Sequence, residues 1–156
     1  MGATALSLTG GGIVWSWWDV APDTPYQLLS TEEAQMVNAL SQAAFPSGQA
    51  IALSGKDAQL DYFFDRLLFG MTGENQKLLK LLLQALNRLA ILSQGNDFLH
   101  CTESEQQLLV EKWLTDESYL FRSAMQSVIV LLSIGYTSHP KASKHLQQYF
   151  RCGFGQ

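Results

Sequence analysis

Cysteine and histidine are the side chains best suited to catalysis or metal binding, and this chain has few of them. They are His100, Cys101, His139, His145 and Cys152. A zinc site needs converging ligands, such as two His four residues apart or a Cys-x-x-Cys pair, and neither spacing occurs. Adjacent residues such as His100 and Cys101 seldom point at each other, which argues against a Cys–His nucleophile. We therefore expect neither a metal site nor a catalytic residue.

The two cysteines leave the redox chemistry of the chain open. A disulfide between Cys101 and Cys152, or from either one to a partner, can form if the compartment is oxidising. Two cysteines are too few for a disulfide scaffold and do not fix the compartment. A small thiol-redox protein that uses this pair is the weakest interpretation, because neither cysteine lies in a Cys-x-x-Cys motif.

Three aspartates, Asp57, Asp61 and Asp65, repeat every four residues and so share one side of a predicted helix. Carboxylates act as general acid and base where burial or crowding separates their pKa values. These three come early in the helix, where its dipole favours negative charge, so we expect them to be solvated. The chain also has no glycine-rich loop between a strand and a helix, which a dinucleotide site needs. The sequence therefore predicts no enzyme.

Two aromatic clusters are the strongest candidates for a functional surface. Large exposed aromatic groups mark interfaces with other proteins or with membranes. One cluster precedes the first predicted helix and the other follows the last strong one. We expect a protein partner to bind at least one of these clusters, whose residues are Trp15, Trp17, Trp18, Tyr136, Tyr149, Phe150 and Phe154.

Hydrophobic periodicity predicts six helices. They cover Ser30 to about Ala44, about Lys56 to Gly70, roughly Glu74 to Leu92, Thr102 to Leu114, Asp116 or Ser118 to Gly135, and Pro140 to about Phe150. Two of them begin with a capping box, in which a Ser or Thr side chain and a Glu three residues later bond each other's backbone N–H. Leucines cover most of the circumference of the third helix, so we expect it to be the central one.

No segment alternates with period two for long enough to predict a strand. The fold class is therefore all-α, a single domain of about six helices packed around a central leucine-rich helix. This helical domain covers residues 30–156. Residues 1–29 form an apolar N-terminal segment followed by a linker, in which Pro22 and Pro25 favour extended chain.

Composition excludes some partners. The 156 residues are 47% apolar and carry a net charge of −4, as expected of a globular chain. Residues 56–156 hold ten bases and ten acids, whereas nucleic-acid binding requires a basic face. No apolar run approaches the roughly 20 residues that span a bilayer, so we expect no transmembrane helix.

The second half of the chain resembles the gluconate 2-dehydrogenase subunit 3 family. The resemblance begins with Phe98-Leu99 and Thr102-Glu103-Ser104-Glu105, continues through Phe121-Arg122 and Ser127-Val128-Ile129-Val130-Leu131-Leu132, and closes with Gly135-Tyr136-Thr137-Ser138-His139-Pro140. The first half is similar more loosely, through Phe45-Pro46 and the leucine-rich helix. The chain departs from the family at its end, where Cys152-Gly153-Phe154-Gly155 replaces a short tail.

The resemblance implies a non-catalytic small subunit of a flavin-dependent alcohol, sugar or polyol dehydrogenase. Members accompany large subunits of the glucose–methanol–choline type. A large subunit would hold FAD and oxidise a hydroxyl group, and a cytochrome c subunit would accept the electrons. The resemblance also implies a periplasmic location, with membrane association through the complex.

The same resemblance suggests an origin for the uncharged start of the chain. Family members often begin with a twin-arginine export signal, and Gly2-Ala3-Thr4-Ala5-Leu6-Ser7-Leu8 looks like the apolar stretch of such a signal. The Arg pair and basic region that precede such a stretch are absent. We expect one of three explanations: translation starts upstream of Met1, the chain has been shortened, or this segment docks on a partner.

An alternative from another functional class is a free-standing helical module that binds an apolar ligand between its leucine-rich helices. Such a module should behave as a monomer and purify together with a lipid. The subunit interpretation instead predicts a chain that associates with a flavoprotein and has no turnover alone.

Overall fold

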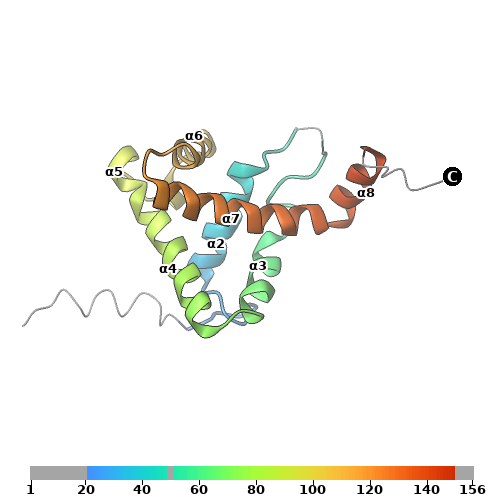
Figure 1. Cartoon of the computed structure of the whole chain (residues 1–156), viewed down its shortest axis with the longest axis horizontal. Helices are drawn as coiled ribbons and strands as arrows, with labels where there is room; N and C mark the ends of the chain where they lie inside the picture. Colours follow the sequence, from blue (N-terminus) through green and yellow to red (C-terminus); the bar gives the residue numbers. More distant parts are fainter. Residues whose placement is uncertain (1–20, 49–50, 150–156) are drawn as a thin grey trace, which may run out of the picture.

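The computed structural model describes residues 21–48 and 51–149, and within these residues all regular structure is helical (Figure 1). The all-α prediction is confirmed. The helices are α2 (Thr31–Ala44), α3 (Leu60–Phe69), α4 (Gly73–Leu89), the short α5 (Ile91–Gln94), the 3-10 turn η1 (Phe98–His100), α6 (Glu103–Leu114), α7 (Tyr119–Ser138) and α8 (Pro140–Tyr149).

Both predicted capping boxes are present. Ser30 Oγ accepts from the Glu33 N–H at 3.3 Å, and the Glu33 carboxylate accepts from the Ser30 N–H at 2.9 Å. Thr102 and Glu105 repeat this pattern at the start of α6. These bonds satisfy backbone N–H groups that the first helical turn leaves without partners, so the two helix starts follow from local sequence.

Three predicted helix bounds were wrong. The third predicted helix does not run unbroken to Leu92, because α4 ends at Leu89 and the separate α5 begins at Ile91. The second helix starts at Leu60 rather than Lys56, because Gln59 adopts a left-handed conformation with φ of +51°, which an α-helix does not accommodate. The fifth predicted helix does not stop at Gly135 but continues to Ser138. Gly135 lies where α7 crosses α3, so its role is to allow a close approach.

The central helix is α2, and the prediction that the leucine-rich helix is central was wrong. α2 packs against α3, α4, α6 and η1, and Figure 1 shows it between α3 and α4 and behind α7. α4 buries only one face, through Lys80, Leu83, Leu86 and Asn87, while Leu78 is exposed. Leucines around most of the circumference of α4 therefore indicate an exposed apolar surface and not a surrounded helix.

Replacing Gly135 by alanine is expected to reduce the free energy of unfolding by about 1–3 kcal/mol, because overpacking displaces core side chains. A Cβ atom there would lie 2.5 Å from Cδ1 of Phe63. Urea denaturation monitored by circular dichroism measures the effect. Gly73→Ala is the control, because nothing lies within 4 Å of a Cβ atom at that position. Equal stability of the two variants would contradict this packing.

Candidate partner interface

The residues with catalytic potential do not converge in the described part of the chain. The His100 ring is exposed and its Nδ1 pairs with the Asp97 carboxylate at the start of η1. His139 and His145 are half-buried, at the end of α7 and within α8. Among the described residues, no group of three or more His, Cys, Asp or Glu side chains could hold a metal ion.

Cys101 is a buried thiol at the end of η1. Its Sγ lies 3.3 Å from the Asp97 carbonyl oxygen, to which the thiol donates. Burial, and secondarily the charges of Glu105 and Asp97, raises the pKa of Cys101 above its ordinary value. This thiol is therefore poorly suited to act as a thiolate nucleophile. Cys152 lies outside the described residues, so the disulfide with Cys101 stays a prediction.

The expectation that the three aspartates are solvated was wrong for two of them. Asp57 is exposed, but Asp61 and Asp65 are each only 5% exposed. The reason is a segment far away in sequence. Residues 26–29, which precede α2, return to α3 and cover these two carboxylates.

The Asp65 carboxylate holds residues 26–29 in place by accepting hydrogen bonds from the backbone of this segment. One carboxylate oxygen accepts from the N–H groups of Leu28 and Leu29 at 2.8 and 2.9 Å, and the other accepts from Gln27 at 2.9 Å. The Tyr26 hydroxyl donates to Asp61 at 2.6 Å. Desolvation and the bond to Asp61 raise the pKa of Tyr26 above its ordinary range. All four bonds position chain rather than substrate, so this cluster is structural.

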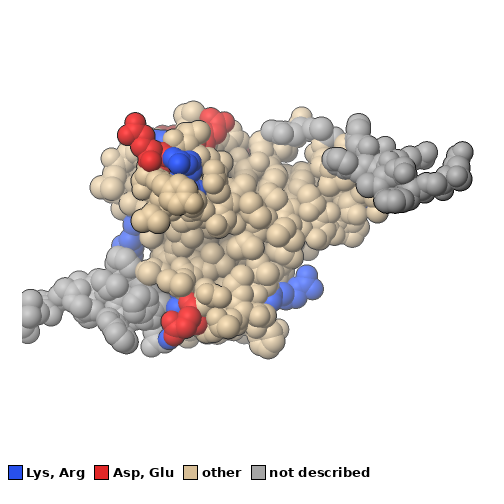
Figure 2. Space-filling model, viewed as in Figure 1, with Lys and Arg blue, Asp and Glu red and all other residues tan. Residues whose placement is uncertain are grey.

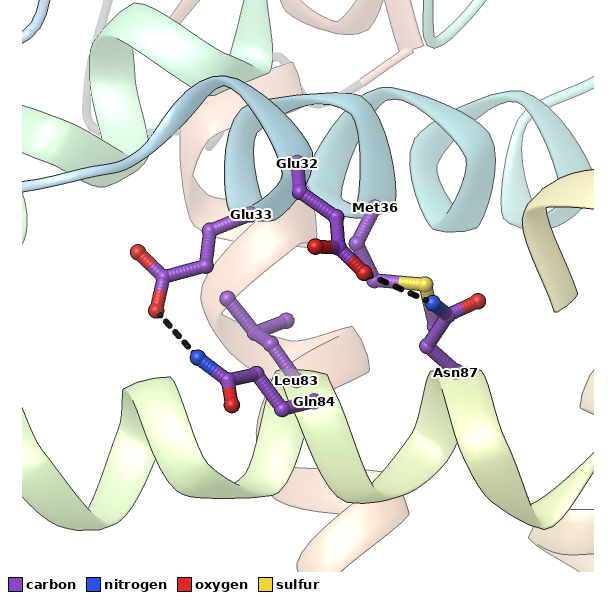
Figure 3. Close-up of a pocket in the computed structure, with 6 residues that line it drawn as sticks. All are labelled: Glu32, Glu33, Met36, Leu83, Gln84 and Asn87. Atoms are coloured by element: carbon purple, nitrogen blue, oxygen red, sulfur yellow. Dashed lines mark hydrogen bonds between the residues drawn. The ribbon is translucent and has the colours of Figure 1, made fainter. Parts of the chain in front are cut away.

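A second buried polar network joins α2 to α4. Lys80 Nζ lies 3.2 Å from a Glu33 carboxylate oxygen and donates to the Leu28 carbonyl at 2.9 Å. Figure 3 shows that Gln84 donates to Glu33, and Asn87 to Glu32, across a small pocket between the two helices. The cavity measures about 10 Å³, the space of a single water molecule. The network therefore joins helices and leaves no room for a ligand.

Tyr136 was expected at a partner interface, but the structure places it in the core. Its ring is buried and stacks on Phe45 with centroids 4.3 Å apart, and its hydroxyl donates to the Leu53 carbonyl at 2.6 Å. α7 continues past the predicted end, and Gly135 and Tyr136 both lie on its buried side. The other residues of the two aromatic clusters stay predictions, because Trp15, Trp17, Trp18, Phe150, Phe154 and the side chain of Tyr149 lie outside the described part of the chain.

Replacing Tyr136 by phenylalanine is expected to reduce the free energy of unfolding by about 1 kcal/mol at pH 7, because the Leu53 carbonyl loses its donor. Burial raises the pKa of Tyr136 above the ordinary value of a tyrosine hydroxyl. The unfolded tyrosine therefore ionises first, and the advantage of the native chain over Tyr136→Phe should shrink as pH rises above 10. Urea denaturation of both proteins at pH 7, 10 and 11 measures this difference in stability. If the native chain instead gained stability over Tyr136→Phe above pH 10, the burial of a neutral Tyr136 hydroxyl would be contradicted.

An exposed apolar corner lies where α5, the end of α6 and the start of α7 meet. Leu92 in α5 and Leu120 in α7 are 84% and 80% exposed, and Ile91 and Tyr119 are also exposed. Beside them is an open groove of about 290 Å³, lined by Leu89, Leu92, Ser93, Lys112, Trp113, Asp116, Ser118 and Phe121. We call Ile91, Leu92, Tyr119, Leu120 and this groove the apolar corner, although the groove lining includes the charged Lys112 and Asp116. Apolar surface of this kind marks protein or membrane contacts.

α7 continues this surface along one side of the molecule. Arg122 is the single charged residue of its 20, and Val130 and Ile134, four residues apart, are half-exposed on one face. Figure 2 shows almost no Lys, Arg, Asp or Glu along the middle of the view, where α7 lies. The apolar corner therefore continues into a long uncharged face.

The hydroxyl groups on α7 reinforce this character. Ser127, Thr137 and Ser138 donate to helix carbonyls three or four residues earlier, at 2.7–2.8 Å for the carbonyls four residues earlier. Because these donors are satisfied within the helix, they need no partner from water or from another chain. Covering the α7 face would therefore carry a small desolvation penalty.

α7 also has the length and hydropathy of a membrane-spanning helix, although the apolar runs of the sequence predicted none. By length and composition alone it could cross a bilayer. Of the 18-residue stretch of α7 that meets this test, 28% is buried in the structure. Its buried residues, Met125, Val128, Leu132, Gly135 and Tyr136, pack into the bundle. α7 is thus a helix of the bundle with one buried side.

Sequence reasoning missed Leu92, Tyr119 and Leu120. A signal was present in the leucine-rich helix, whose apolar residues exceed what one buried face needs. That excess predicted a central helix, whereas in the structure Leu78 and Leu92 are exposed. Tyr119 and Leu120 occupy the first turn of α7, where the periodic pattern alone does not distinguish a buried position from an exposed one.

Comparison with known proteins identifies one family. The sequence model of the family described as gluconate 2-dehydrogenase subunit 3 matches residues 31–155, which contain all the helices from α2 to α8. No curated protein and no solved structure matches the chain.

Proposed function

This chain belongs to the gluconate 2-dehydrogenase subunit 3 family, and from that premise we propose that it is the non-catalytic small subunit of a flavin-dependent dehydrogenase. Its task is to bind and stabilise a large subunit that oxidises an alcohol, sugar or polyol. The proposal extends to a periplasmic complex, exported with the help of this chain, in which a cytochrome c subunit accepts electrons.

The apolar corner and the uncharged face of α7 carry this proposal. Interfaces between subunits are depleted of charge at their centre and rich in large apolar side chains. Leu92 and Leu120 project from the corner with most of their surface free, and α7 adds a face whose hydroxyls are already bonded. A lone protein gains nothing from such a surface, whereas a subunit buries it against its partner.

We place the flavin in the large subunit. A dinucleotide is usually held where a glycine-rich turn joins a strand to the amino end of a helix. The described residues of this chain form helices and loops only. The small subunit then supplies binding surface and stability, and the large subunit supplies the redox chemistry.

The test is a pull-down of the tagged full-length chain from its source organism, with a visible absorbance spectrum and a dye-reduction assay on the eluate. We expect a large chain, a flavin spectrum and dehydrogenase activity that the small subunit alone lacks. A chain that elutes alone and colourless, or together with a lipid, would contradict the proposal.

Substitutions then locate the surface. Leu92→Glu/Leu120→Glu should abolish co-elution of the flavoprotein, because it places two charges in the apolar corner. The matched control is Phe69→Glu/Leu78→Glu, which charges two other exposed apolar residues, one at the end of α3 and one in α4. Loss of the flavoprotein from both double variants, or from neither, would argue against the corner as the interface.

A further inference from the structure

The charges of this chain are divided between two regions. Residues 118–156 contain no Asp or Glu and four bases, which are Arg122, Lys141, Lys144 and Arg151. All fourteen acids and the other six bases lie in residues 1–117. A strongly acidic bundle is therefore followed by a basic carboxyl-terminal region.

α8 presents part of this basic charge away from the bundle. It packs chiefly on α7, and Figure 1 shows it beyond the end of α7 that lies opposite α5 and α6. Ala142 faces inward and is fully buried, whereas Lys141 and Lys144, three residues apart, are exposed on the other side. Neither lysine forms an ion pair with a carboxylate of the described residues.

The lysines do not serve the stability of α8 itself. Both lie in the first half of a ten-residue helix, where the helix dipole favours negative and not positive charge. The acids in the described part of the bundle do not neutralise them through ion pairs. Exposed charge of one sign at such a place steers and orients association with a surface of the opposite sign.

We propose that α8 is a basic docking arm that contacts an acidic patch on the large dehydrogenase subunit, an inference that rests on the function proposed above. The apolar corner lies at the other end of α7, whose 20 residues span about 30 Å. The partner surface therefore carries an apolar patch and an acidic patch about that far apart. The two ends together fix one orientation of the complex.

The number of charges on α8 favours a protein over an anionic membrane as its binding partner. Recognition of anionic lipid by charge uses clusters of four to eight bases, and the sequence after α7 has three, Lys141, Lys144 and Arg151. The inward side of α8 buries the small Ala142, which gives little apolar surface for insertion into a lipid headgroup region. The acidic bundle would also be repelled by an anionic bilayer.

The test measures binding of the full-length chain to the isolated large subunit at 50 and 300 mM salt. Lys141→Glu/Lys144→Glu should weaken binding at least tenfold at low salt, mainly through a slower association rate, and should remove most of the salt dependence. The control is Lys56→Glu/Lys77→Glu, which changes the net charge equally at two exposed lysines of the acidic region. It should bind within threefold of the native chain.

The outcomes separate this inference from the proposed function. If the native chain binds the large subunit and both double variants weaken binding equally, or neither does, the docking arm is wrong while the subunit role stands. If the native chain does not bind a flavin-containing large subunit at all, both proposals fail. Binding to phosphatidylglycerol vesicles that Lys141→Glu/Lys144→Glu abolishes, without an effect on the large subunit, would assign α8 to the membrane and overturn the docking arm.

Discussion

Replacing Asp65 by alanine is expected to reduce the free energy of unfolding by about 3–5 kcal/mol, because buried donors that lose a charged acceptor keep their full desolvation cost. The carboxylate accepts from three successive N–H groups, those of Gln27, Leu28 and Leu29, and is itself only 5% exposed. Alanine cannot accept any of these bonds. Urea denaturation measures the loss, and hydrogen exchange at the three amides should show that residues 26–29 become mobile first.

Two further substitutions separate this bond set from a general effect of charge. Asp65→Asn keeps one acceptor oxygen but turns an N–H donor toward a backbone N–H. Its loss of unfolding free energy should therefore be smaller than that of Asp65→Ala but still measurable. Asp57→Ala, at an exposed carboxylate that accepts from Ser54, should cost about 1 kcal/mol or less. A loss at Asp65→Ala no greater than at Asp57→Ala would contradict the described role.

Replacing Lys80 by methionine is expected to cost about 3–5 kcal/mol, because it leaves a buried carboxylate without its cation. Lys80 pairs with Glu33 at 3.2 Å, and both side chains are almost fully buried. It also holds the Leu28 carbonyl, so the substitution loosens the same segment that Asp65 fastens. Calorimetry or urea denaturation at pH 7 measures the loss.

A double-mutant cycle tests the pairing itself. Glu33→Gln removes the charge but keeps a side chain that can complete the capping box at Ser30. Lys80→Met/Glu33→Gln should therefore be more stable than Lys80→Met alone, because no unpaired charge remains buried. Lys77→Met, at an exposed lysine on the same helix, is the control and should be nearly neutral. Additive losses in the cycle would show that the two charges are not coupled.

The sequence by itself determined the features that depend on near neighbours. The capping boxes at Ser30 and Thr102, the helical class and the family resemblance all follow from residues within one or two helical turns, or from a motif order along the chain. Local hydrogen bonds and hydrophobic periodicity act over these short distances, so they can be read without knowing which helix packs on which.

Only the tertiary structure decided which faces are covered. Asp61 and Asp65 have the spacing of a solvated stripe, and they are buried because a segment more than 30 residues earlier returns to cover them. α4 has the leucines of a central helix but lies at the side, while α2 is central. Burial depends on contacts between residues distant in sequence, and periodicity gives the direction of a face without saying what lies against it.

The sequence predicted that the chain has an apolar interface, but not which residues form it. The sequence indicated spare apolar surface, yet Tyr136, one of the residues expected there, packs in the core, and Leu92 and Leu120 form the described apolar corner instead. That corner is assembled from three helices whose ends meet in space, and α7 places it about 30 Å from α8. Residue types along the chain set the amount of apolar surface, and helix packing decided where it is exposed.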